Sequence, residues 1–207
     1  MKRLGRANIV AIALLAALVI GWSAAREACR AEEKKDESQK APAFTLEDVD
    51  GNKVSLSDFA DKIVVLEWMN PGCPIWARHH KAGTFRTLAE KYKDKGVVWL
   101  AINSTNSADK EKNKKFAETE KVPYPILDDH AGTVGKAYGA KTSPHMFVID
   151  KHGRLAYEGA IDDDPAGKKE NPLNYVEQAL TELLAGKAVS VPKTEPYGCS
   201  VKYAPQK

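Results

Sequence analysis

The sequence predicts an α/β protein with a central mixed sheet flanked by helices. Apolar runs of the length of buried strands alternate with segments of helical periodicity along most of its 207 residues. Strands that alternate with helices are usually parallel, because each helix carries the chain back across the sheet. Late in the pattern, two strands meet directly at a turn over residues 151–153, which adds an antiparallel pair.

Each predicted element has a local signal. Asp50-Gly51, between two short segments that contain apolar residues, is typical of a hairpin turn. Residues 63–69 are a nearly continuous apolar run, as expected of a buried central strand. Periodicity and chain breakers place the remaining strands at 97–102, 124–127, 145–150 and 155–161, a helical turn at 58–60, and helices at 74–93, 108–121, 133–138 and 172–185.

The beginning of the chain predicts export. Residues 1–25 join a basic start to twelve consecutive apolar residues and then small ones, the pattern of a secretory signal peptide or an uncleaved membrane anchor. Residues 26–41 hold five positive and five negative side chains and no large apolar one, which predicts a solvated linker. We therefore expect a periplasmic or otherwise extracytoplasmic protein, membrane-tethered if the segment is not cleaved, in a compartment where disulfides persist.

Composition and charge exclude several classes of protein. A hydrophobic content of 43% with 29% charged residues indicates a globular chain. The formal net charge of +3 comes from basic residues among the first six, so the body has no positive excess for nucleic acid. Three cysteines are too few for a disulfide scaffold. The predicted organisation is a targeting segment at 1–25, a linker at 26–41, one folded domain at 42–187 and an irregular tail at 188–207 that carries Cys199.

Cys73 is the predicted reactive residue. It follows the first buried strand, at the edge of the sheet where sites gather in α/β folds, and it precedes Pro74, which suits the first position of a helix. At that cap, its side chain would face unpaired backbone N–H groups, which favour the thiolate. A thiolate there is prepared to attack a disulfide or a peroxide. The alternative is a small buried thiol that ends a core strand.

Short motifs follow one another in a specific order through the domain. They are Pro42-Ala43-Phe44-Thr45-Leu46, Asp50-Gly51-Asn52, Val54-Ser55-Leu56-Ser57-Asp58-Phe59, Gly72-Cys73-Pro74, Val122-Pro123-Tyr124-Pro125-Ile126, Ala137-Tyr138-Gly139, and Ser143-Pro144 before 145–150. In this order, residues 42–188 resemble the thioredoxin-fold redoxins, which join peroxiredoxins of the alkyl hydroperoxide reductase and thiol-specific antioxidant type with periplasmic thioredoxin-like reductases. The resemblance implies a thioredoxin-like fold with an N-terminal β-hairpin extension and a thiol-dependent oxidoreductase. The sequence gives no sign of a metal, nucleotide or organic cofactor.

The sequence departs from both branches of that family. Thioredoxin-like reductases have a second cysteine three residues after the first, where this chain has Trp76. Peroxiredoxins have Thr or Ser three residues before the reactive cysteine and an Arg near the start of the late strand. Asn70 and Pro144 occupy those two places here. The substrate is therefore left open between a disulfide, such as that of a protein, and a hydroperoxide.

The resemblance also implies roles around Cys73. Pro144 matches the cis-proline that lies beside the reactive sulfur and shapes the substrate groove, although an ordinary proline can also begin a strand. The turn residues Asn70, Gly72 and Pro74 would border the same groove. Trp76 is expected either over the sulfur or in the core.

Glu67 interrupts an apolar strand six residues before Cys73. A buried carboxylate is costly unless it is paired or protonated with a raised pKa. Thioredoxins resemble this chain in having a buried acid at that spacing, which moves protons during exchange. An ion-paired or edge-exposed glutamate is the alternative. His79 and His80 are expected on a polar helix face.

Cys199 lies in a tail with little else to bury. Related redoxins often use a distant resolving cysteine, which implies that Cys199 pairs with oxidised Cys73 while an external donor, thioredoxin-like or a membrane thiol reductase, reduces the pair. A structural bond, a link to Cys29 and an inter-chain bridge remain alternatives. Two further functions stay open: a peroxidase that uses Asn70 and backbone N–H groups, and a non-catalytic module that holds Cu(I) through Cys73 and a histidine.

Overall fold

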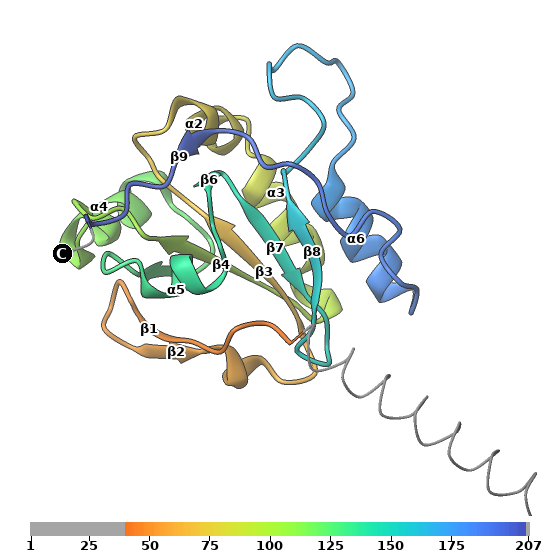
Figure 1. The fold of residues 1–207 in the computed structure, drawn as a ribbon, viewed down its shortest axis with the longest axis horizontal. Helices are drawn as coiled ribbons and strands as arrows, with labels where there is room; N and C mark the ends of the chain where they lie inside the picture. The colour runs from red at the N-terminus through yellow and green to blue at the C-terminus, as the bar shows by residue number, and fades with distance from the viewer. Residues whose placement is uncertain (1–39, 206–207) are drawn as a thin grey trace, which may run out of the picture. The chain divides into compact units, whose positions relative to one another are not determined.

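A seven-stranded mixed sheet organises residues 40–205, the part of the chain that the computed structural model describes (Figure 1). Its strand order is β2-β1-β5-β4-β3-β7-β8. The three central strands β3, β4 and β5 are parallel, and the outer pairings are antiparallel. The bounds are β1 Thr45–Asp48, β2 Lys53–Ser55, β3 Ile63–Trp68, β4 Val97–Asn103, β5 Ile126–Asp128, β7 Met146–Ile149 and β8 Leu155–Gly159. The α/β class and the mixed sheet are thus confirmed.

Both faces of the sheet are covered. Side chains of β3 alternate between the faces, so Val65 packs in one core and Val64 and Leu66 in the other. This double burial explains why the strand is apolar throughout. Apolar residues of α2 Pro74–Lys81, α3 Thr84–Tyr92, α4 Lys110–Glu120 and α6 Tyr175–Leu184 join the first core, and those of α5 Thr133–Ala137, the 3-10 turn η1 Leu56–Phe59 and the β1–β2 hairpin join the second.

Two predicted elements differ in detail. The helix expected over 74–93 is two helices, because Gly83 takes the left-handed backbone conformation with φ of 76° and ends the run. A short 3-10 turn, η2 Lys93–Lys95, follows the second helix. The N-terminal hairpin is also more than an appendage, since β1 pairs with β5 and extends the main sheet.

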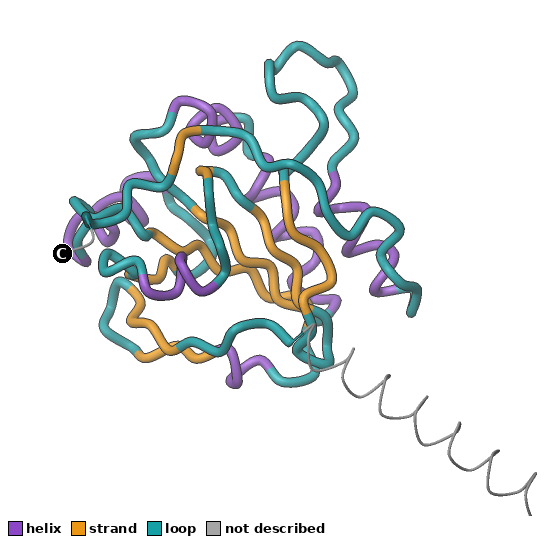
Figure 2. Tube along the Cα trace, in the orientation of Figure 1, coloured by secondary structure: helices purple, strands orange, loops and turns teal. Residues whose placement is uncertain are grey.

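The tail at 188–205, which we call the strap, is irregular apart from one two-residue strand. It runs from the end of α6 across the ends of β8 and β7 toward α2 (Figures 1 and 2). The backbone of Thr194 donates to Glu158, and β9 Cys199–Ser200 pairs antiparallel with β6 Thr142–Ser143. The strap is therefore held by backbone hydrogen bonds along its length.

Three predictions fall on residues outside 40–205: the targeting segment, most of the linker and Cys29. Among the helices that the structure describes, each is too short or too polar to cross a membrane.

Candidate active site around Cys73 and Cys199

Cys73 lies where β3 gives way to α2, as the sequence predicts. The turn between them is closed by Asn70, whose carbonyl accepts the Cys73 N–H at 2.9 Å and whose Oδ1 accepts the Gly72 N–H at 2.9 Å. Cys73 is the N-cap of α2, and Pro74 occupies the first helical position. The Cys73 side chain is only 1% exposed.

The Cys73 sulfur faces the cis-proline segment and the strap. Its thiol donates to the Ser143 carbonyl at 2.9 Å, and it accepts the Cys199 N–H at 3.3 Å. The peptide bond from Ser143 to Pro144 is cis, as predicted. One expectation needs correction: the Cys73 sulfur makes no capping hydrogen bond with the first turn of α2. The N–H of Ile75, in that turn, is a hydrogen-bond partner of the Cys199 sulfur.

Cys199 is the second cysteine of the site. It stands opposite Ser143 in the β6–β9 ladder, and its side chain is hydrogen-bonded to that of Cys73. Both are free thiols in this structure. The hydrogen bond with Cys73, and then burial, raise the pKa of the Cys199 thiol. The two sulfurs that the sequence separates by 126 positions are thus neighbours.

Glu67 is completely buried in the middle of the sheet, between β4 and β7, which rules out the edge-exposed alternative. Its two carboxylate oxygens accept the indole N–H groups of Trp76 and Trp99, each at 2.7 Å, and the Tyr124 hydroxyl is a further hydrogen-bond partner. Burial raises the pKa of Glu67 to about 7, and these hydrogen bonds oppose the rise. A group with this pKa exchanges its proton near neutral pH.

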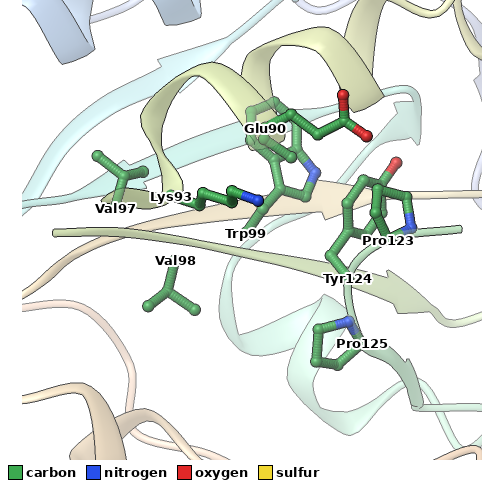
Figure 3. Close-up of a pocket in the computed structure, with 9 residues that line it drawn as sticks. Glu90, Lys93, Val97, Val98, Trp99, Pro123, Tyr124 and Pro125 are labelled. Atoms are coloured by element: carbon green, nitrogen blue, oxygen red, sulfur yellow. The ribbon is translucent and has the colours of Figure 1, made fainter. Parts of the chain in front are cut away.

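A pocket of about 310 Å³ lies beyond two of these partners (Figure 3). Trp99 and Tyr124 form its inner wall, with Glu90 and Lys93 at its rim. Cys73, Cys199 and Pro144 do not line it. The pocket is therefore separate from the cysteine pair, and two of its lining residues, Trp99 and Tyr124, are hydrogen-bond partners of Glu67.

The remaining predicted residues divide between the site and the core. Trp76 is a core residue: its ring is 2% exposed, it bonds Glu67, and it stacks on His80 with ring centroids 4.9 Å apart. His79 does not lie on a polar face, because its imidazole is buried against Tyr197 and Asp162. Sequence reasoning missed both of these partners, which bear no motif.

Within residues 40–205 we find no group of three His, Cys, Asp or Glu side chains arranged to hold a metal ion.

Comparison with known families decides the class of this chain. The family model described as Redoxin matches residues 36–176. The chain belongs to the redoxin family. The thiol-disulfide oxidoreductase ResA of Bacillus cereus is 30% identical over 149 residues, which cover 72% of this chain and 84% of that protein. A chloroplastic peroxiredoxin Q of Suaeda salsa is 34% identical over 137 residues, 60% of each chain.

A solved structure is similar to this chain over most of its length. This chain superposes on the structure of an uncharacterized conserved protein from Geobacillus kaustophilus with a TM-score of 0.74 and 32% sequence identity. The match covers 82% of this chain and 93% of that one. The predicted thioredoxin-like fold and the resemblance to redoxins are confirmed, and the redoxin is an oxidoreductase of the class that includes thiol-disulfide oxidoreductases and peroxiredoxins.

Proposed function

We propose that this redoxin is an exported two-cysteine thiol oxidoreductase in which Cys73 attacks the substrate and Cys199 resolves the product. The observation that carries the proposal is the contact between the two cysteines: the Cys199 N–H lies 3.3 Å from the Cys73 sulfur, and the two side chains are hydrogen-bonded. No other cysteine of the described chain is available to form a local pair with Cys73. Export is supported by the signal-like pattern of residues 1–25.

The exchange proceeds in two steps. The Cys73 thiolate attacks one sulfur of a substrate disulfide, forms a mixed disulfide and releases the other sulfur as a thiolate. Cys199 then attacks the Cys73 sulfur, forms the Cys73–Cys199 disulfide and releases the second thiolate. The substrate gains two electrons and the two protons that the cysteines lose. An external thiol donor reverses the oxidation of the protein.

Two neighbouring groups have supporting roles in this proposal. Pro144 and the turn at Asn70–Gly72–Pro74 border the sulfur where a substrate would approach. Glu67, with its pKa raised to about 7, stores or supplies a proton, and its hydrogen bonds with Trp76 and Trp99 connect it to the core cluster that contains Cys73.

A hydroperoxide is the alternative substrate. The Cys73 thiolate would then form a sulfenic acid and release an alcohol, and Cys199 would condense with it to give the same disulfide and water. The arginines nearest in sequence do not supply the missing peroxide ligand, because Arg78 binds the carbonyls of Asp164 and Pro165 and Arg86 binds that of Glu120. The disulfide substrate is therefore favoured.

The test is a disulfide map of the full chain. Reduced protein is treated separately with glutathione disulfide and with one equivalent of hydrogen peroxide, free thiols are blocked, and peptides are identified by mass spectrometry. We expect a Cys73–Cys199 peptide with glutathione disulfide, and a stable Cys73–glutathione adduct in the Cys199→Ser variant. Cys29→Ser is the matched control and should not change either product. Reaction with peroxide alone would select the peroxidase, and unreacted Cys73 in both arms would refute the proposal.

A thiol module for Cu(I) is a second candidate, because two adjacent thiolates suit a soft cation better than one cysteine with a histidine does. Cu(I) titration of the reduced protein separates it from the oxidoreductase. A stoichiometric site lost in both Cys73→Ser and Cys199→Ser, together with an absence of disulfide exchange, would favour the carrier.

A further inference from the structure

Four side chains near the two cysteines form a partly buried polar cluster that the exchange reaction does not use, with two of them, His79 and Asp162, buried. We call Arg78, His79, Asp162 and Tyr197 the clasp. The Tyr197 hydroxyl donates to the Asp162 carboxylate and lies 3.1 Å from Nε2 of His79. The other ring nitrogen of His79 faces Asp162 at 3.8 Å. Arg78 contacts Nε2 of His79 at 3.2 Å.

The clasp is anchored in the body of the protein. Asp162 follows β8, is 6% exposed, and pairs through its backbone with Asn174 at the start of α6. Arg78 extends the anchor by donating to the carbonyls of Asp164 and Pro165, at 2.8 and 3.1 Å. Buried charged groups of this kind are stable only when their hydrogen bonds are satisfied. Tyr197 is thus held by a fixed partner.

The same cluster connects the two segments that carry the cysteines. Arg78 and His79 belong to α2, the helix that Cys73 caps. Tyr197 belongs to the strap and precedes Cys199 by two residues. Between them Gly198 has φ of 134°, and a Cβ atom there would lie 2.2 Å from the Ser143 carbonyl oxygen. The strap is therefore pressed against the cis-proline segment immediately after Tyr197.

We propose that Tyr197, held by Asp162 and His79, is a positioning residue that keeps the strap closed over Cys73 and keeps Cys199 beside it. This proposal rests on the proposed two-cysteine function. The Tyr197 hydroxyl stays protonated, and so remains a donor, at neutral pH, because burial, and then the hydrogen bond to Asp162, raise its pKa.

Closure by the clasp has opposite consequences for the two chemical steps. In the closed state Cys73 is buried beneath β9, so a substrate reaches its sulfur only when the strap opens. Once a mixed disulfide has formed, a held Tyr197 keeps Cys199 close to it and speeds resolution. The clasp therefore slows the attack of Cys73 on bulky substrates. It also favours resolution of the mixed disulfide by Cys199 over attack on it by an external thiol.

The test uses Tyr197→Phe in the full chain with Cys29→Ser, and 5,5′-dithiobis(2-nitrobenzoic acid) as the disulfide probe. Attack by Cys73 releases one equivalent of nitrothiobenzoate, and resolution by Cys199 releases the second. Loss of a hydrogen bond to a charged group predicts an attack phase about tenfold faster, since the open state is more populated. The resolution phase is expected to be slower. The attack phase is measured again with Cys199→Ser, where it stands alone.

Two variants separate positioning from general destabilisation. Tyr138→Phe removes a buried hydroxyl of the opposite face, which donates to the Pro42 carbonyl at 2.7 Å, and should leave both phases unchanged at a matched loss of stability. Asp162→Asn keeps an acceptor for Tyr197 without its charge, and its attack rate should lie between those of the wild type and Tyr197→Phe.

The outcomes distinguish the clasp from the function on which it rests. Equal attack rates in Tyr197→Phe and the wild type, or a change of both phases in the same direction, would overturn the role of Tyr197. If both cysteines of the wild type instead end as mixed disulfides with the probe, and no Cys73–Cys199 disulfide forms, the proposed function is overturned. The attack rates measured with Cys199→Ser would still decide whether the clasp closes the strap.

Discussion

Substitution of Glu67 by glutamine should remove a specific dependence of stability on pH. The pKa of Glu67 rises from 4.5, its ordinary value, to about 7 in the folded protein, because the carboxyl group is completely buried. The folded state therefore holds this proton more tightly than the unfolded chain does. The associated stability is fully present below pH 4.5 and is lost as the pH rises through 7.

The size of the effect follows from the shift. One pKa unit corresponds to about 1.4 kcal/mol, so a rise from 4.5 to about 7 predicts that ionisation of Glu67 costs about 3 kcal/mol of unfolding free energy above pH 7. Glutamine has the same shape and does not titrate. Its amide leaves one of the donors from Trp76, Trp99 and Tyr124 poorly matched, but that cost does not vary with pH.

The assay is urea denaturation of the reduced wild-type and Glu67→Gln proteins between pH 4 and 8. We expect the unfolding free energy of the wild type to fall relative to the variant by about 3 kcal/mol across this range. Other titrating groups are common to both proteins and cancel in the difference. Glu111→Gln, at the exposed start of α4, controls for the substitution itself. Parallel curves for the wild type and Glu67→Gln would refute the assignment of a protonated, buried Glu67.

Two further predictions concern neighbours of the site. Tyr124→Phe removes a hydrogen bond that lowers the pKa of Glu67, so that pKa should rise above about 7. The infrared band of the carboxyl C=O group reports the protonation of Glu67, and its titration midpoint should move to higher pH in the variant. An unchanged midpoint would contradict the contact. Gly198→Ala should lower the free energy of unfolding by about 2 kcal/mol or more and slow formation of the Cys73–Cys199 disulfide. The reason is that the new Cβ would lie 2.2 Å from the Ser143 carbonyl oxygen. Gly139→Ala is its control, because Gly139 also has a positive φ, of 64°, but has open space around the position, and this variant should leave disulfide formation unchanged. Equal disulfide rates in the two alanine variants would show that the strap does not depend on this close approach.

The sequence predicted the parts of the fold that depend on burial. The run at 63–69 is apolar because both faces of β3 are covered, and β4 is apolar for the same reason, so hydropathy located both strands. The break at Gly83 had a weak signal, a glycine inside a helical pattern, and was predicted as continuous helix. The pairing of β1 with β5 had no signal in the sequence, since it depends on which edge of the finished sheet is free.

The position of Cys73 at the start of α2 was predictable because local sequence fixes it. A buried strand, a turn and a proline after the cysteine determine that it caps a helix, whatever the rest of the chain does. The direction of its sulfur was not predictable. That direction depends on the Ser143 carbonyl, 70 residues later in the chain, and on Cys199, whose N–H donates to the Cys73 sulfur.

The strap shows why the remaining part of the site was hidden from the sequence. Its apolar contacts come from scattered residues without periodicity, which are Val189, Tyr197, Cys199 and Val201. Its docking also depends on backbone pairing with Glu158, Ser143 and Lys141, and on the hydrogen bond from the Tyr197 hydroxyl to Asp162. Backbone hydrogen bonds carry no residue signature, and a tyrosine among prolines is equally typical of a free tail. The burial of His79 has the same origin, because its partner Tyr197 lies 118 positions away. A segment held in this way can open without unfolding the core, as the proposed role of the strap as a cover over Cys73 requires.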